Sequence, residues 1–203
     1  MENSVQDTLA ELELEVEVEV VQSKDERQTY SVWAIPTDDV SCRIKKLMEG
    51  LRAEFGGPEI EPHIALAGSI RLSPDNMLKK FEALEDPIQG YIPKVEAVIT
   101  RRSYYQCVCI LFQRPYYKKM YDILSNTSGH FDISNPDLPH LALLYGNLTE
   151  EERKRAQEKV SILDESITDL SFPIASVALY KTNYQDKTLK SWEKITEKIL
   201  RPR

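Results

Sequence analysis

The 203-residue sequence lacks a cysteine framework, because its three cysteines, Cys42, Cys107 and Cys109, form an odd and sparse set. Such a set does not support the disulfide scaffold of a small secreted protein. No CxxC or paired-histidine spacing accompanies the cysteines, so we expect no bound metal and no cofactor. Cys107 and Cys109 lie two apart in an apolar run, which predicts that both point the same way from one strand as buried small residues.

Long apolar runs are also missing. No stretch approaches the roughly 20 apolar residues that a membrane-spanning helix needs. The N-terminus has no basic start followed by an apolar stretch, and its acidic character is the wrong sign for an organelle transit peptide. We therefore expect a cytoplasmic protein that has no membrane partner.

Excess charge is absent from most of the chain. The formal net charge is −7. Residues 1–29 hold nine acidic and two basic residues, whereas residues 30–203 hold 24 of each. A neutral body lacks the basic surface that sequence-independent binding of nucleic acid requires. We therefore expect no long nucleic acid among the partners.

The acidic segment is strand-like in pattern, because glutamate alternates with leucine or valine over residues 11–20. A lone strand leaves its backbone unpaired, and its glutamates repel one another. We predict a disordered acidic tail over residues 1–29, followed by one two-lobed domain over residues 30–203. The alternative is that residues 11–20 add an edge strand to the body or to a partner.

The body mixes predicted helices and strands without the regular alternation of a parallel sheet. This pattern predicts an α+β fold with mostly antiparallel sheets and helices packed outside them. Residues 192–200 remain ambiguous. The predicted strands are 30–35, 63–67, 95–100, 106–112, 140–145 and 172–181, and the predicted helices are 44–55, 74–84, 117–124 and 149–160.

One short pattern occurs twice. Residues 62–66 read Pro-His-Ile-Ala-Leu, and residues 139–143 read Pro-His-Leu-Ala-Leu. Each copy follows a turn-like segment, and each is preceded by a predicted helix and followed by another. This repetition predicts an internally duplicated, two-lobed domain.

The repeated pattern places His63 on the same strand face as Ala65, and His140 on the same face as Ala142. The larger Ile and Leu residues of both copies then face a core, while the alanines leave room for a ligand. A single histidine on a strand is more often structural, but the repetition favours a functional pair. Adjacent strands would bring both imidazoles into one cleft.

Residues 30–200 resemble the plant cyclic phosphodiesterases of the two-histidine phosphoesterase superfamily. The resemblance depends on both histidine motifs, on Tyr-Ser-Val-Trp-Ala-Ile-Pro at residues 30–36, and on Asp-Lys-Thr-Leu at residues 186–189. It implies antiparallel sheets lining a central cleft and a metal-free reaction.

The implied substrates are ADP-ribose 1″,2″-cyclic phosphate and nucleoside 2′,3′-cyclic phosphates, which the reaction opens to ADP-ribose 1″-phosphate and to 2′-phosphates. Both substrates arise after tRNA splicing. The resemblance therefore predicts that the partner is a small-molecule cyclic phosphate or nucleotide, and we expect a monomer.

Hydrolysis of a cyclic phosphate needs a base for water and an acid for the leaving ribose oxygen, and His63 and His140 suit these roles. The sequence does not assign the base and the acid. The resembling family has Ser or Thr two residues after each histidine, to donate to a phosphate oxygen, where this chain has Ala65 and Ala142. Loss of one such donor lowers turnover by about 10²–10³. The two alanines are either deliberate substitutions or natural drift in a relative that still binds, and we expect slow or absent turnover.

Three aromatic residues match positions that line the family's cleft. Trp33 and Tyr105 either stack on a base or ribose, or pack in the core. Strict alternation puts Tyr145 on the face opposite His140, so contact with a ligand requires a bulge or strand end there. His130 lies in a polar stretch and is interpreted as a loop residue.

Two other functions fit these residues. The first alternative to a hydrolase is a weakly catalytic protein that binds cyclic nucleotides. The second is an RNA end-joining enzyme on the same fold. The neutral body disfavours the second, because a long RNA needs a basic surface.

Overall fold

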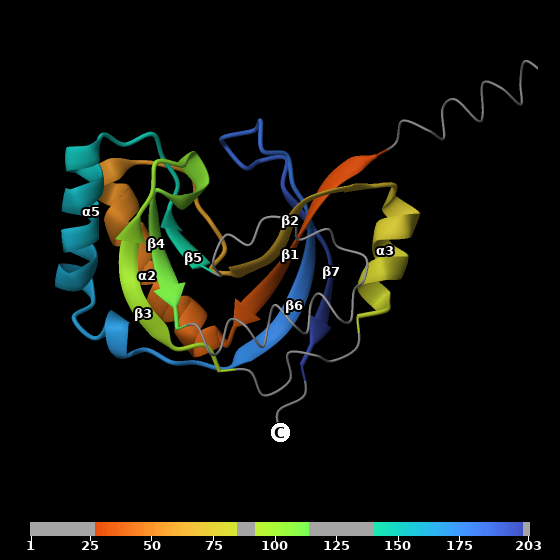
Figure 1. Ribbon diagram of the computed structural model, residues 1–203, viewed down its shortest axis with the longest axis horizontal. Coiled ribbons are helices and arrows are strands. Elements are labelled where there is room, and N and C mark those ends of the chain that lie inside the picture. The colour runs from red at the N-terminus through yellow and green to blue at the C-terminus, as the bar shows by residue number, and fades with distance from the viewer. Residues whose placement is uncertain (1–26, 85–91, 114–139, 201–203) are drawn as a thin grey trace, which may run out of the picture.

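The computed structural model describes residues 27–84, 92–113 and 140–200, and it contains three α-helices and seven β-strands (Figure 1). No helix in these ranges is long and apolar enough to cross a membrane. In chain order the elements are β1 (Gln28–Pro36), α2 (Asp38–Phe55), β2 (Ile64–Leu72), α3 (Pro74–Glu82), β3 (Val95–Thr100), a 3₁₀ turn (Tyr104–Gln106), β4 (Val108–Phe112), β5 (His140–Leu144), α5 (Glu150–Leu163), a 3₁₀ turn (Ile167–Asp169), β6 (Ile174–Lys181) and β7 (Glu193–Ile199).

The strands form one sheet in the order β3-β4-β5-β2-β1-β6-β7, and every neighbouring pair is antiparallel. The predicted α+β fold with antiparallel strands is confirmed. The two parts of this sheet, β3-β4-β5 and β2-β1-β6-β7, are called lobes here. They join where β2 meets β5, through the single register pair of Ile64 with Leu141.

Helices α2 and α5 lie together against the β3-β4-β5 lobe, and α3 lies at the other end of the molecule (Figure 1). Helix α2 buries a stripe at helical spacing and ends at Gly56, whose φ of 73° favours glycine. Helix α5 begins with a capping box, in which Thr149 and Glu152 bond each other's backbone N–H groups. The Arg43 guanidinium donates to both oxygens of Asp164 at 2.7 Å and ties α2 to the end of α5.

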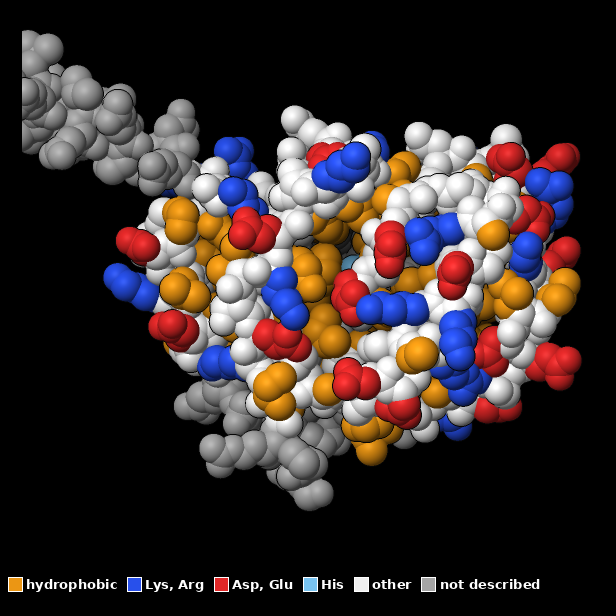
Figure 2. Space-filling view, turned by 180° about the vertical axis from the view of Figure 1, so that it is seen from behind, with side chains coloured by type: hydrophobic (Ala, Val, Ile, Leu, Met, Phe, Trp, Pro, Cys, Tyr) orange, Lys and Arg blue, Asp and Glu red, His pale blue; other side chains and the backbone are white. Residues whose placement is uncertain are grey.

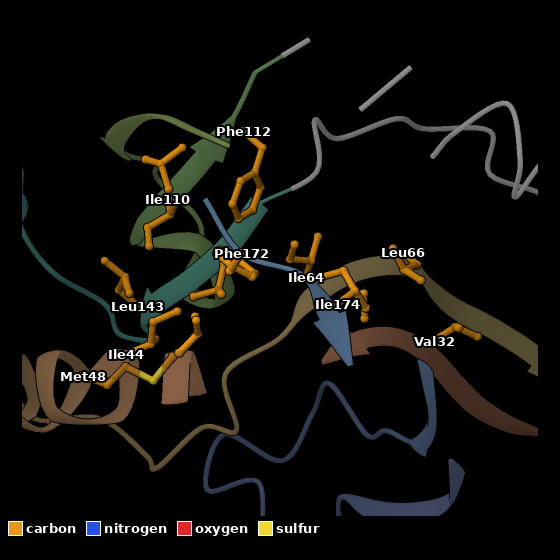
Figure 3. Close-up of a cluster of buried hydrophobic side chains, with 14 of the residues drawn as sticks. Val32, Ile44, Met48, Ile64, Leu66, Ile110, Phe112, Leu143, Phe172 and Ile174 are labelled. Carbon is orange, nitrogen blue, oxygen red and sulfur yellow. The ribbon is translucent and has the colours of Figure 1, made fainter. Parts of the chain in front are cut away.

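The main core fills the space between the helices and one face of the sheet. Ile44 and Met48 of α2 point toward Ile110 and Leu143 of the sheet, close to Phe172 (Figure 3). The large residues of both repeated pentapeptides belong to this core, as predicted: Ile64, Leu66, Leu141 and Leu143.

Cys107 and Cys109 are both buried, as predicted, but the prediction that they point the same way is wrong. Cys107 lies in the main core, whereas Cys109 packs with Ala142 in a second apolar cluster on the opposite face. Cys107 precedes β4, and the register shifts between Val108 and Cys109. An irregularity of this kind breaks the alternation that places residues i and i+2 on one face.

Several element boundaries differ from the sequence prediction. Strand β1 begins two residues earlier than predicted, and His63 lies just before β2, which extends to Leu72. The ambiguous C-terminal stretch forms the edge strand β7. The predicted helix at 117–124, His130 and nearly all of the predicted acidic tail lie outside the described residues.

Candidate active site

The two motif histidines lie where neighbouring strands begin: His63 directly precedes β2, and His140 is the first residue of β5. Ile64 pairs with Leu141, and continuing this antiparallel register by one residue places His63 and His140 diagonally on one sheet face. Diagonal neighbours of this kind are about 7–8 Å apart. The side chains are only 5% and 8% exposed. Figure 2 shows a histidine at the floor of a hollow rimmed by hydrophobic side chains.

The surroundings of His63 favour its neutral form. Burial lowers the pKa of His63 from 6.5 to about 4; the hydrogen bond with Glu61 opposes this shift and nearby His140 adds to it. Its Nδ1 lies 2.7 Å from the carbonyl oxygen of Glu61. Because a carbonyl only accepts, Nδ1 carries the proton in the neutral ring and Nε2 keeps its lone pair. His63 can therefore accept a proton at neutral pH.

Trp33 stacks on the His63 ring, with centroids 3.7 Å apart and planes 12° apart. Tyr180 also stacks on Trp33, at 3.8 Å and 25°. Strands β2 and β6 lie on opposite sides of β1, so His63 and Tyr180 cover opposite faces of the indole. Both faces of the Trp33 indole are therefore covered by rings of the protein, which leaves no face free to stack on a base. The contacts of Trp33 favour packing against His63.

The two alanines share the face of the histidines, as predicted, but their surroundings differ. Ala65 is half-buried and lies opposite Trp33 in the β1–β2 register. Ala142 is only 4% exposed and lies opposite Cys109 in the β4–β5 register. Neither side chain has a hydroxyl to donate to a phosphate oxygen.

Tyr145 directly follows the last residue of β5, Leu144. It packs with Ile60, Cys109 and Ala142, on the histidine side of the sheet. Because β5 ends at Leu144, Tyr145 meets the condition that was stated for its contact with a ligand. Burial raises the pKa of the Tyr145 phenol, so it stays protonated and can donate a hydrogen bond.

A close backbone approach links the two motifs. Gly57 has a φ of 99°, and a Cβ there would lie 2.4 Å from the carbonyl oxygen of Tyr145. Glycine is therefore required where the segment leading to His63 crosses the end of the His140 strand.

Tyr105 joins a larger aromatic group. Its hydroxyl donates to the carbonyl oxygen of Tyr184, and its ring makes an edge contact with Tyr145 at a centroid distance of 5.2 Å. Trp192 lies 5.9 Å from Tyr105 and 5.9 Å from Trp33. These contacts bring all three sequence-predicted aromatic residues to the histidine side of the sheet.

Sequence reasoning missed four aromatic residues of this group: Tyr104, Tyr180, Tyr184 and Trp192. Tyr184 and Trp192 flank the Asp-Lys-Thr-Leu segment that carried part of the resemblance, which was the available signal. Within residues 27–84, 92–113 and 140–200, no three metal-ligating side chains gather into a possible metal site.

No family model matches the chain. The "Cyclic phosphodiesterase" of Arabidopsis thaliana is 42% identical over 178 residues, which cover 87% of this chain and 97% of the relative.

Solved structures of E. coli LigT share the fold. The complex with 3′-AMP has a TM-score of 0.56 at 13% identity and covers 86% of this chain and 99% of LigT. The apo form has a TM-score of 0.55 at 12% identity and covers 87% and 99%.

Proposed function

The chain belongs to the cyclic phosphodiesterase family, and from this premise we propose that it hydrolyses cyclic phosphates with His63 and His140. The observation that carries the proposal is the diagonal placement of the two motif histidines on one face of neighbouring strands. Two groups so placed can contact opposite sides of one phosphate.

We propose that His63 is the base and His140 is the acid. Nε2 of neutral His63 takes a proton from water while the water oxygen attacks phosphorus. The bond from phosphorus to one ribose oxygen then breaks, and protonated His140 gives its proton to that oxygen. A bound anionic phosphate raises the pKa of His63 toward a value useful for this transfer. Each proton transfer contributes about 10²–10⁴ in rate.

Negative charge develops on the phosphate oxygens during the reaction, and the two motifs supply no hydroxyl donors to stabilise it. Ala65 and Ala142 supply no hydroxyl, and one lost donor lowers turnover by about 10²–10³. The protein is therefore expected to bind cyclic phosphates and to hydrolyse them slowly.

We propose two substrate types: ADP-ribose 1″,2″-cyclic phosphate, opened to the 1″-phosphate, and nucleoside 2′,3′-cyclic phosphates, opened to 2′-phosphates. The proposed setting is the cytoplasm after tRNA splicing, with the protein acting as a monomer on small molecules. The balanced charge of residues 30–203 supports small ligands over long nucleic acid.

The test is hydrolysis of both substrates by the purified chain, followed by chromatography of the products in the presence of a chelator. His63→Gln and His140→Gln should each lower the rate by at least about 10²-fold. Lys154→Gln, on the exposed side of α5, is the control and should match the parent chain. A parent rate that survives either histidine substitution would refute the proposed roles.

A second candidate is a binding protein for cyclic nucleotides, which the two alanines favour. Calorimetry with 2′,3′-cyclic AMP separates the two functions. Micromolar affinity without any product after prolonged incubation would identify a binding protein.

A further inference from the structure

The segment between β6 and β7, residues 182–192, spans the two lobes and is here called the bridging loop. It leaves β6 in one lobe and contacts the 3₁₀ turn Tyr104–Gln106, which precedes β4 in the other. The Tyr104 hydroxyl donates to the carbonyl oxygen of Lys187 at 2.9 Å, and the Tyr105 hydroxyl donates to that of Tyr184. The loop therefore lies beside the histidine face and not away from it.

The bridging loop is held in shape from within. The Asp186 carboxylate accepts hydrogen bonds from the backbone and hydroxyl of Thr188 and from those of Ser191. These bonds hold the pKa of Asp186 below its usual value. The Trp192 indole donates to the carbonyl oxygen of Asn183 at 2.9 Å. A loop ordered before binding loses less entropy when a ligand arrives.

The side chain of Lys187 is exposed and lies against two aromatic rings. Its Nζ lies 4.4 Å from the ring centroid of Tyr104 and 4.2 Å from that of Tyr105. No ion pair joins it to a carboxylate within the part of the chain that the structure describes. Aromatic faces attract an ammonium without neutralising it, so its N–H donors remain available to an anion.

Lys187 is connected to His63 through a series of neighbouring rings. Tyr105, beneath the ammonium, lies 5.9 Å from Trp192. Trp192 lies 5.9 Å from Trp33, which stacks directly on His63. A ligand bound at the histidines that extends along these rings would meet a second positive charge at their far end.

We propose that Lys187, on the faces of Tyr104 and Tyr105, forms a second anion subsite that binds a phosphate group other than the one opened at the histidines. This inference rests on the proposed function. A nucleoside 2′,3′-cyclic phosphate has one phosphorus atom, whereas ADP-ribose 1″,2″-cyclic phosphate also carries a diphosphate. The subsite therefore favours the second substrate type over the first.

The test compares the products ADP-ribose 1″-phosphate and adenosine 2′-phosphate as ligands in calorimetry. Lys187→Met should weaken binding of the diphosphate ligand about tenfold, as expected for one lost charge-assisted contact. It should change the Kd of adenosine 2′-phosphate less than twofold. Lys187→Arg should restore affinity for the diphosphate ligand, and Lys190→Met, on the same loop, is the matched control.

An equal loss of affinity for both ligands in Lys187→Met would assign Lys187 to the folding of the loop and overturn the subsite. Unchanged affinity for both ligands would also overturn the subsite. If Lys187→Met loses affinity only for the diphosphate ligand, and the parent chain shows no hydrolysis, the subsite stands and the proposed catalysis is rejected. Failure of the parent chain to bind either product would reject both.

Discussion

The two lobes contribute the same pentapeptide pattern in different surroundings. In one lobe, His63 stacks on Trp33, and its Nδ1 is 2.7 Å from the carbonyl oxygen of Glu61. In the other, His140 is the first residue of β5 and pairs with Leu111 of β4.

The difference shows how a duplicated motif can carry unequal roles. The sequence repeat sets the strand face of each histidine, while the neighbouring strands set the ring contacts and the proton affinity. His63 is held by an aromatic stack and a backbone carbonyl as a neutral ring whose Nε2 keeps its lone pair, which is the state that a base requires.

The largest expected effect on turnover comes from restoring the hydroxyl group that both motifs lack. The double substitution Ala65→Thr with Ala142→Ser returns a hydroxyl two residues after each histidine. Turnover of a 2′,3′-cyclic nucleotide should rise by about 10²–10⁴, because each donor can stabilise charge on a phosphate oxygen. Steady-state kinetics of the two single variants and the double variant measure the share of each lobe. Unchanged turnover in the double variant would show that these positions do not contact the phosphate.

The next effect should separate the histidines by pH. Unfolded histidine has a pKa near 6.5 and folded His63 near 4. Between these values the unfolded chain binds more protons, so the free energy of unfolding falls as the pH falls. The His63 contribution to this loss is about 3 kcal/mol between pH 7 and pH 4.

Urea denaturation at several pH values measures this loss. His63→Gln should remove the His63 part of the slope, whatever its constant effect on packing. An identical pH dependence in the variant and the parent chain would contradict the assigned protonation of His63.

A smaller effect concerns the contact between Trp33 and the His63 ring. Trp33→Leu removes the surface that orients His63 and should lower kcat about 10–100-fold with little change in KM, because small misplacements of a catalytic group are costly. Trp33→Phe should retain most of the activity. Nitrogen NMR of His63 should show Nδ1–H alone in the parent chain and a mixture of tautomers in Trp33→Leu. A single tautomer in every variant would mean that Trp33 does not position the ring.

The smallest effect compares the space around the alanines. Ala142 is packed against Cys109 and Tyr145 and is 4% exposed, whereas Ala65 is half-buried. Ala142→Thr should therefore destabilise the fold by about 1–3 kcal/mol through overpacking. Ala65→Thr should have less effect, and thermal unfolding of both variants measures the difference. Equal destabilisation would show that the two motif positions are sterically equivalent.

Much of this architecture is predictable from the sequence, because it depends on local patterns. The apolar spacing of α2, the Thr149–Glu152 capping box and the alternating faces of both pentapeptides involve residues close in the chain. The repeat also predicts that two histidines share one face. The register pair of Ile64 with Leu141, each directly after a motif histidine, agrees with that prediction.

The remaining features depend on contacts between distant strands or on local irregularities. The stack of Tyr180, Trp33 and His63 needs the order β6-β1-β2, which alternation within one strand does not contain. The opposite faces of Cys107 and Cys109 follow from a register shift. Strand β7 was ambiguous because four of its seven residues are charged, a composition suited to an edge strand.

The most direct test of the central claim is a crystal structure of the chain with adenosine 2′-phosphate. If both imidazoles act on one phosphorus atom, ring nitrogens of His63 and His140 should each lie about 2.6–3.2 Å from oxygens of the same phosphate. A phosphate that contacts only one of these histidines, or that binds away from both, would contradict the account.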